Sequence, residues 1–205
     1  MKVAVSILKS KYSEEETIKK INETNAEYLH LDVMDGTFVN EVSFEYEHLG
    51  EVKKPLQVHL MVSNPFSYIG KYALKNTESI IIHTELTEDI DSLLDIIKSY
   101  GLKCGLALNP ETQIEKITSY IDKLDYVLIL TVNPGRGGQK LIKDVLYKLD
   151  ELNRIRVDKN LQFEIIVDGG VNNENIDLMN NADIVVSGSY VCMNDNFQEQ
   201  INHLR

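Results

Sequence analysis

Short apolar runs of strand length alternate with helix-like stretches along the whole chain. The runs that we predict as strands are Val3–Leu8, Tyr28–Asp32, Leu56–Met61, Ser79–His83, Lys103–Leu108, Tyr126–Thr131, Phe163–Asp168 and Ile184–Ser187. Several of them, such as Val127–Leu130, are apolar at every position, as parallel strands covered on both faces are. Eight such units predict an α/β protein with a (β/α)₈ TIM barrel, because an open doubly wound sheet typically has fewer strands.

The stretches between the strands carry the signals that begin and end helices. Ser13 and Glu16 have the spacing of a capping box, Asn64-Pro65 is a typical helix start, and Gly101 suits a left-handed helix end. The helices expected are Ser13–Asn25, a weak stretch at Phe44–Val52, Pro65–Lys75, Asp89–Tyr100, Gln113–Ile121, Lys140–Arg156, Asn173–Asn180 and Phe197–Leu204. No linker or charge block interrupts this pattern, so we expect residues 1–205 to form a single barrel domain.

The composition and charge exclude several classes of protein. A formal net charge of −11 over 205 residues argues against any broad contact with nucleic acid or an anionic membrane. No apolar segment reaches the roughly 18 residues of a membrane span, and Met1–Ala4 leads into a strand instead of a signal peptide. Cys104 and Cys192 lack metal-type spacing, which predicts reduced thiols. We therefore expect a cytoplasmic protein in which local donors must capture any anionic ligand.

Polar side chains gather where the predicted strands end, and those ends form the active face of a barrel. His30 and Asp32 alternate with two apolar residues, so they project from the same face of their strand. His59 lies in the third strand, Asp168 ends the seventh, and Ser6 lies in the first. Two histidines and two carboxylates from three strand ends suit one divalent metal ion, with positions left open for a substrate. The same set suits a reaction that needs a Lewis acid and two proton-transfer groups.

Each of these residues also has a plain structural interpretation. A single histidine at a strand end is more often a hydrogen-bonded core residue than a ligand, and a lone Asp-Gly-Gly is usually a turn. The coincidence of all four side chains on compatible strand ends favours the site. His48, His83 and His203 have no such company in the sequence, and we interpret them as structural or surface residues.

Glycine-rich turns follow the last three predicted strands. They contain Gly135, Gly137 and Gly138 after the sixth strand, Gly169 and Gly170 after the seventh, and Gly188 with Ser189 after the eighth. Any one of them alone is most simply a tight loop. Their clustering on neighbouring strands favours a phosphate site, because glycine lets backbone N–H groups approach an anion closely. Met34 and Met61 follow the two histidine strands, and they are either gap-fillers or an apolar wall beside the site.

Seven segments carry a further signal through their order along the chain. They are Val5-Ser6-Ile7-Leu8, His30 to Gly36 with Phe38-Val39, His59-Leu60-Met61-Val62, Leu108-Asn109-Pro110, Val132 to Gly135 with Gly137-Gly138-Gln139, Val167 to Val171, and Gly188-Ser189. Any one of these segments is weak evidence. The ordered set resembles the ribulose-phosphate 3-epimerase family, the pentose-5-phosphate 3-epimerases, from one end of the chain to the other.

The resemblance implies a (β/α)₈ barrel that interconverts D-ribulose 5-phosphate and D-xylulose 5-phosphate, a step of the pentose phosphate pathway. It implies one divalent metal ion (Zn, Fe, Mn or Co) that is bound by His30, Asp32, His59 and Asp168. Asp32 and Asp168 would also be the acid/base pair on opposite faces of C3. The implied substrate contacts are Ser6, His59, Met34, Met61, Gly135, Arg136, Gly137, Gly138, Gly169, Gly170, Gly188 and Ser189. A homo-oligomer, either a dimer or a hexamer, is implied as well.

Four departures from the family pattern bear on the substrate. Family members usually have an aromatic residue at Arg136, a Met at Leu130 and a Glu or Gln at Ile166, and Asn40–Glu45 replaces a Pro- and Gly-containing segment. Two alternatives therefore stay open: a 3-epimerase of a ketohexose 6-phosphate such as D-allulose 6-phosphate, or a non-catalytic sugar-phosphate-binding barrel. Related decarboxylases have a Lys two residues after the strand-two Asp, where Met34 stands here, which disfavours decarboxylation.

Overall fold

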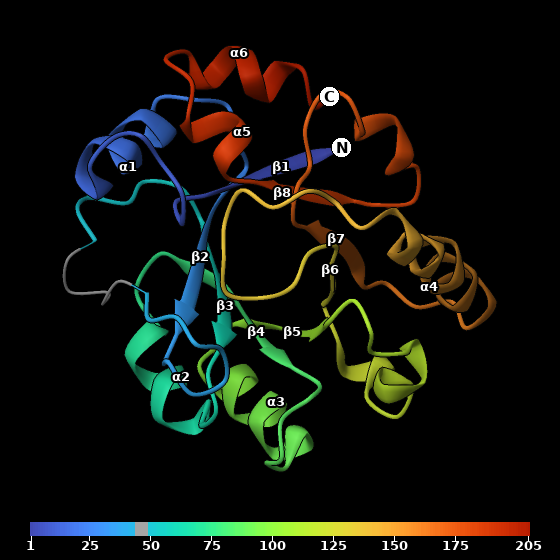
Figure 1. Ribbon diagram of the computed structural model, residues 1–205. Helices are drawn as coiled ribbons and strands as arrows, with labels where there is room; N and C mark the ends of the chain where they lie inside the picture. The colour runs from blue at the N-terminus through green and yellow to red at the C-terminus, as the bar shows by residue number, and fades with distance from the viewer. Residues whose placement is uncertain (44–48) are drawn as a thin grey trace.

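A closed barrel of eight parallel strands, ordered as in the chain, forms the centre of the molecule (Figure 1). This architecture comes from a computed structural model that describes residues 1–43 and 49–205. The strands are β1 (Lys2–Ser6), β2 (Tyr28–Met34), β3 (Leu56–Met61), β4 (Thr77–His83), β5 (Lys103–Leu108), β6 (Tyr126–Leu130), β7 (Glu164–Asp168) and β8 (Ile184–Ser187). Strand β1 pairs in parallel with both β2 and β8, which closes the barrel. The predicted TIM barrel is confirmed.

Helices surround the strands on the outside of the barrel (Figure 1). They are α1 (Glu14–Asn22), α2 (Phe66–Tyr72), α3 (Ile90–Ser99), α4 (Tyr147–Asp158) and α6 (Phe197–Asn202). Ser13 caps α1 as predicted, because its side chain accepts a hydrogen bond from the Glu16 N–H. Gly101 has a φ of 74° after α3, in the left-handed conformation that its position predicts. Among the described residues, no helix combines the length and the apolar character that crossing a membrane requires.

Two expected helices are replaced by short 3-10 helices in the structure. The stretch Gln113–Ile121 contains the 3-10 helix η2 (Ile114–Ile117), with η3 (Ile121–Lys123) at its end. Ile114 and Ile117 are both buried, and their spacing of three places them on one face of a 3-10 helix. Only η5 (Ile176–Leu178) forms within the expected helix at Asn173–Asn180.

The other differences lie at element ends and in loops. Helix α4 begins at Tyr147 instead of Lys140, because the Ile142 N–H donates to the Thr131 carbonyl and holds this segment against the end of β6. A short helix, α5 (Ser189–Cys192), follows β8 and was not predicted, since four residues are too few to show a helical period. Of the weak helix expected at Phe44–Val52, residues 44–48 lie outside the described residues, and residues 49–52 form a loop.

Side chains of each strand alternate between the barrel interior and the helix layer. On β2, Leu29, Leu31 and Val33 belong to the large apolar cluster beneath the helices. A separate interior cluster consists of Ala4, Tyr28, Ile81, Ala107, Tyr126, Leu128, Leu130, Ile166, Ile184 and Val186. His30 and Asp32 therefore share the inward face of β2 with Tyr28, as their spacing predicts. The polar site is thus built into the same interior that the apolar cluster fills.

Candidate active site

Four side chains from three strand ends converge inside the barrel. They are His30 and Asp32 of β2, His59 of β3 and Asp168 of β7, and one ligand-type atom of each lies within 4.8 Å of the others. His30 Nε2 lies 3.5 Å from Asp32 Oδ1 and 3.7 Å from Asp168 Oδ2. His59 Nδ1 lies 3.1 Å and 3.7 Å from the same two oxygens. The structure thus brings together the four residues that the sequence analysis selected.

The donor set of this cluster fits a divalent metal ion. Both histidine side chains are fully buried, and the Asp32 and Asp168 side chains are only 6% and 14% exposed. His30 Nε2 is buried without a hydrogen-bond partner among the described residues, and it faces the two carboxylates. A buried polar atom without a partner is costly, and a cation between this nitrogen and the carboxylates would satisfy it. The observed side chains are therefore suitable ligands for a metal.

Hydrogen bonds behind the cluster orient its members. His30 Nδ1 lies 3.1 Å from Gln57 Oε1, so Nδ1 carries a proton and Nε2 faces the cluster. Burial opposes a charge on this imidazole, but Asp32 and then Asp168 outweigh it and raise the pKa of His30 to about 9, so a bound cation would take the place of the Nε2 proton. Ser6 Oγ donates to Asp32 Oδ2 at 2.7 Å and accepts from the Leu8 N–H at 3.3 Å. Gln57 was not predicted as a site residue from the sequence. Its signal was present, because Gln57 precedes His59 by two residues and therefore lies on the same face of β3.

The two carboxyl groups have pKa values that differ widely. Burial opposes the charge on Asp32, but the neighbouring His30 and His59 outweigh it and hold the pKa of that carboxyl well below its usual range. Burial, and then the charge of Asp32, raise the pKa of Asp168 to about 7. Burial also lowers the pKa of His59 to about 4, which keeps this imidazole neutral. Near neutral pH, one carboxylate is therefore ionised while the other is poised to hold or release a proton.

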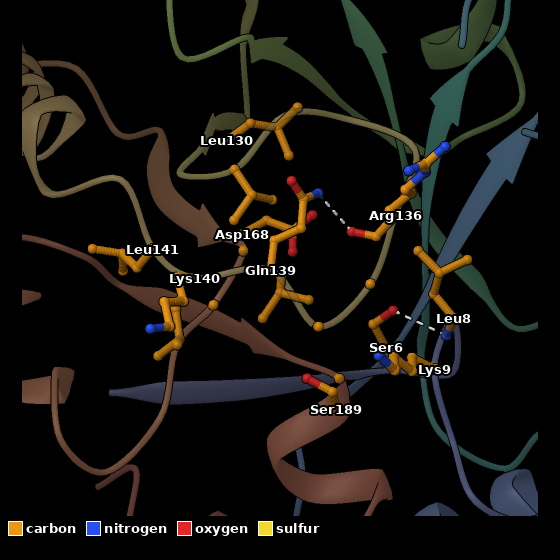
Figure 2. A pocket seen from close by; sticks show the side chains of 18 of the residues that line it. Ser6, Leu8, Lys9, Leu130, Arg136, Gln139, Lys140, Leu141, Asp168 and Ser189 are labelled. Carbon is orange, nitrogen blue, oxygen red and sulfur yellow. Dashed lines mark hydrogen bonds between the residues drawn. The ribbon is translucent and has the colours of Figure 1, made fainter. Parts of the chain in front are cut away.

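A cavity of about 600 Å³ opens at this cluster, and Asp32 and Asp168 line it. Figure 2 shows Asp168 among the lining side chains. Of the predicted substrate contacts, the cavity is lined by Ser6, Met61, Gly135, Arg136, Gly137, Gly138, Gly169, Gly170, Gly188 and Ser189. Met34 and His59 are not among the lining residues, and both are buried. The three glycine-rich turns thus meet around one cavity, next to the two carboxyl groups.

The turn after β7 depends on glycine. Gly169 has a φ of 120°, and a Cβ at this position would lie 2.5 Å from Val132 Cγ2. The Thr131 hydroxyl contacts the carbonyl oxygens of Asp168 at 3.0 Å and Gly169 at 2.6 Å. The end of β7 is therefore packed closely against the end of β6. Backbone groups, not side chains, form the cavity wall there.

Two positively charged residues that line the cavity, Arg136 and Lys9, differ in whether another side chain already binds them. Arg136 lines the cavity, but its Nε donates to Glu41 Oε1 at 2.9 Å, and in Figure 2 the guanidinium points away from Asp168. Lys9, which the sequence analysis did not select, also lines the cavity next to Gly138. Its ammonium group makes no hydrogen bond or ion pair within the described part of the chain, so it is free to meet an anion.

His83 corrects an interpretation from the sequence. It is fully buried at the end of β4, and its Nε2 lies 2.9 Å from His59 Nε2. It is therefore a neighbour of the cluster and not an isolated structural residue. His203 is exposed and contacts the Tyr190 hydroxyl, as expected for a surface histidine, and His48 lies outside the described residues.

Comparison with known proteins identifies the family. A model of the ribulose-phosphate 3-epimerase family matches residues 2–192. The ribulose-phosphate 3-epimerase of Bacillus subtilis is 36% identical, over 100% of this chain and 98% of its own length. That of Helicobacter pylori is 38% identical, over 93% of this chain and 90% of its own.

Solved structures support the fold alone. A mutant tryptophan synthase α-subunit from Pyrococcus furiosus has a TM-score of 0.70 at 13% identity, over 99% of this chain and 97% of that one. KGPDC from Streptococcus mutans has a TM-score of 0.68 at 9% identity, over 99% of this chain and 95% of that one. On the sequence matches, with the barrel and the site geometry in agreement, the chain belongs to the ribulose-phosphate 3-epimerase family.

Proposed function

We propose that this carbohydrate epimerase interconverts D-ribulose 5-phosphate and D-xylulose 5-phosphate by inverting the configuration at C3. The names of the relatives give ribulose phosphate as their substrate and C3 as the centre that they invert, and the C3 epimer of D-ribulose 5-phosphate is D-xylulose 5-phosphate. The observation that carries the proposed chemistry is the pair Asp32 and Asp168, whose pKa values are displaced in opposite directions at one cavity. The volume of that cavity, about 600 Å³, is in the usual range for small-molecule sites.

Asp32 and Asp168 act as the two proton-transfer groups in this proposal. Strands β1 and β8 separate β2 from β7 around the barrel, so the two carboxyl groups reach the site from different sides. In one direction, ionised Asp32 accepts the C3 proton, and Asp168 delivers a proton to the opposite face of the carbon. The roles exchange in the reverse direction. Ser6 holds Asp32 Oδ2, which leaves Oδ1 directed toward the two histidines.

His30, Asp32, His59 and Asp168 would hold a divalent metal ion such as Zn, Fe, Mn or Co. When bound, the ion supplies Lewis-acid stabilisation for the negative charge that develops on the substrate oxygens at C2 and C3. The protein residues provide the rest of the environment. His59 is buried and neutral, so it contributes a lone pair without adding positive charge that would compete with the cation.

The phosphate of the substrate would lie against the glycine-rich turns. Their backbone N–H groups suit an anion, and the turns after β6, β7 and β8 line the same cavity as the two carboxyl groups. The net charge of −11 makes the overall field unfavourable for an anion, so these local donors must bind it. Lys9, Lys140 and Lys143 line the cavity without a side-chain partner among the described residues, whereas Arg136 is paired with Glu41. Lys9 lies beside Gly138 of the glycine-rich turn after β6.

A ketohexose 6-phosphate such as D-allulose 6-phosphate is the second candidate substrate. It is favoured by the location of the departures from the family pattern, because Leu130 and Arg136 both line the cavity. Glu41, from the altered segment after β2, is the residue that holds Arg136. Ile166 is different, since it is fully buried in the interior apolar cluster. A non-catalytic sugar-phosphate-binding barrel has no need for two carboxyl groups with separated pKa values, which disfavours that alternative.

Proton NMR of D-ribulose 5-phosphate with the purified protein in D₂O tests the proposal. With Mn²⁺ or Zn²⁺ present, we expect deuterium to enter at C3 and xylulose 5-phosphate to form, and a chelator should stop both. Asp32→Asn and Asp168→Asn should each lower kcat by at least about 100-fold, as loss of a general acid or base does. Glu174→Gln, an acidic residue of the same cavity wall, is the matched control and should keep its activity. Exchange with D-allulose 6-phosphate alone would replace the substrate, and no exchange with either sugar would refute the epimerase assignment.

A further inference from the structure

A line of polar contacts leads from His59 away from the cavity and into the wall of the barrel. His59 Nε2 lies 2.9 Å from His83 Nε2, and His83 Nδ1 lies 2.9 Å from Glu85 Oε2. Both imidazole rings are fully buried, and they are stacked with centroids 5.0 Å apart. None of these contacts is explained by the proton transfers assigned to Asp32 and Asp168. We call His83, Glu85 and Asn109 the positioning arm.

With a metal ion in the four-residue cluster, the hydrogen-bond chemistry of these contacts favours one arrangement of protons in neutral rings. An ionised carboxylate only accepts hydrogen bonds, so the His83 nitrogen that faces Glu85 must carry the proton. The other nitrogen of His83, Nε2, is then an acceptor, and it requires the proton of His59 on Nε2. His59 Nδ1 then keeps its lone pair for the ion that would lie between it and the oxygens Asp32 Oδ1 and Asp168 Oδ2. Without an ion, the 3.1 Å contact between Nδ1 and the ionised Asp32 Oδ1 favours the opposite tautomer, so the cation and His83 act together on His59.

We propose that His83 is a positioning residue that, held by Glu85, fixes the tautomer and ring orientation of His59 so that Nδ1 binds the metal ion. This inference rests on the proposed function, because it assumes that the four-residue cluster holds a metal. Outer partners of this kind orient metal-binding histidines and increase their basicity. His30 has a neutral partner, Gln57, in the corresponding place. The two histidines of the cluster are therefore supported by different chemistry.

Glu85 is held rigidly enough to serve as the fixed end of this chain of contacts. Its second oxygen, Oε1, accepts from the Asn109 N–H at 3.0 Å and from the Thr112 hydroxyl. The Asn109 and Pro110 carbonyls accept in turn from Lys148 Nζ, at 3.0 Å and 2.9 Å. Lys148 is fully buried, so these carbonyl contacts replace the hydration of its ammonium group. The segment Leu108-Asn109-Pro110 thereby gains a role, since it anchors the carboxylate behind the candidate metal ligands.

The ring of Phe38 completes the surroundings of His83. The two ring centroids are 4.6 Å apart, so Phe38 of the loop after β2 packs on the imidazole. With Glu85 on one nitrogen, His59 on the other and Phe38 on the ring, His83 has no room to rotate into another hydrogen-bonded position. This restriction is what a positioning residue needs.

Metal affinity measured on the purified full chain, by competition with a chelator of known affinity, tests the proposal without using activity. We expect His83→Ala and Glu85→Gln to weaken Zn²⁺ or Mn²⁺ binding by about 10–100-fold, the usual effect of losing an outer partner. Thr84→Val is the matched control, because Thr84 is buried between the two residues and its hydroxyl contacts, among the described residues, the Ala107 carbonyl alone. It should leave metal affinity unchanged. Thermal melting of each metal-free variant confirms that the barrel is folded.

The outcomes separate this inference from the proposed function. Absence of Zn²⁺ and Mn²⁺ binding by the unmodified protein would refute the metal site itself. Normal binding by that protein, together with binding within twofold of it by both His83→Ala and Glu85→Gln, would refute the positioning arm alone. If His83→Ala does not fold, Glu85→Gln decides. A nitrogen-15 NMR spectrum of the Zn²⁺-loaded protein is an independent check, because a proton found on His59 Nδ1 would overturn the proposal.

Discussion

Gly169→Ala is the substitution whose cost can be worked out most directly from the structure. Gly169 follows the candidate ligand Asp168 and has a φ of 120°, a conformation that residues with a Cβ rarely adopt. The added Cβ would lie 2.5 Å from Cγ2 and 2.9 Å from Cγ1 of Val132, which is itself buried. The substitution therefore combines a backbone cost with a steric cost. The second of these depends on one identified neighbour.

The two costs can be separated by a double-mutant cycle. Holding an alanine in this backbone conformation costs about 1–3 kcal/mol, and displacing a packed side chain costs about 1–3 kcal/mol more. We expect Gly169→Ala to lower the free energy of unfolding by roughly 2–6 kcal/mol. Val132→Ala removes both clashing methyl groups and leaves only its Cβ, at 3.1 Å. In that background the cost of Gly169→Ala should fall to about 1–3 kcal/mol, the backbone cost alone.

Urea unfolding followed by circular dichroism measures these free energies for the four proteins of the cycle. Gly101→Ala is the control, because its φ is also positive, at 74°, but no atom lies within 4 Å of the added Cβ. It should cost about 1–2 kcal/mol and show no coupling to Val132→Ala. A coupling energy below about 0.5 kcal/mol between positions 169 and 132 would show that the two sites are independent. The steric argument for glycine beside the candidate site would then be refuted.

Further predictions concern binding, acid stability and assembly. Lys9→Met should raise the KM for the phosphorylated ketose several-fold without changing kcat. Lys140→Met, a variant of another lysine on the same cavity wall, is the comparison. An unchanged KM for Lys9→Met would show that Lys9 does not bind the phosphate. Burial opposes the charge of Asp35, but hydrogen bonds from Ser63 and Phe38 lower its pKa to about 2. Its stabilising contribution is therefore present above the unfolded pKa of about 3.9 and lost as the pH falls through 2, so Asp35→Asn should flatten the decline of urea stability between pH 5 and pH 2. A decline as steep as that of the unmodified protein would contradict this assignment. Gel filtration tests the predicted dimer or hexamer, and a strict monomer would exclude both.

The barrel and the four converging side chains could be predicted because they depend on local patterns. Apolar strand runs indicate parallel strands, and a parallel barrel collects the ends of its strands at one face. The two-residue alternation places His30 and Asp32 on one side of β2. Neither step requires knowledge of how distant strands pair. The order of the strands around the barrel then follows from their order in the chain.

The place of His83 could not be predicted, for a reason that lies in strand register. The pairing of β3 with β4 shifts between Leu56 and Gln57, so that His59 pairs with Ile81. Ile81 lies in the interior cluster, and His83, two residues later, therefore points inward as well. A one-residue change of register would reverse every side chain of the strand. The sequence contains no sign of this irregularity, so it did not indicate which face of β4 His83 occupies.

The 3-10 helices and the contact between Arg136 and Glu41 could not be predicted from the sequence, for a different reason. A helical period predicts which residues face the core, but it does not distinguish a long helix from short turns that bury the same residues. Arg136 pairs with Glu41, 95 residues away in the chain, and the length of an exposed loop contains no information about such a contact. Contacts between surface side chains that lie far apart in the chain therefore cannot be predicted from this sequence.

The pairing of β1 with β8 has a consequence for how the protein acquires its site during folding. Three of the candidate ligands, His30, Asp32 and His59, belong to the neighbouring strands β2 and β3, whereas Asp168 and the glycine-rich turns come from the last strands. An early intermediate can therefore assemble three ligands but not the fourth. Contacts between distant parts of a chain form slowly, because the connecting loop must close first. In refolding experiments, full metal affinity should appear only with the last step of barrel closure, which makes the metal a reporter of the moment when the two ends of the sheet meet.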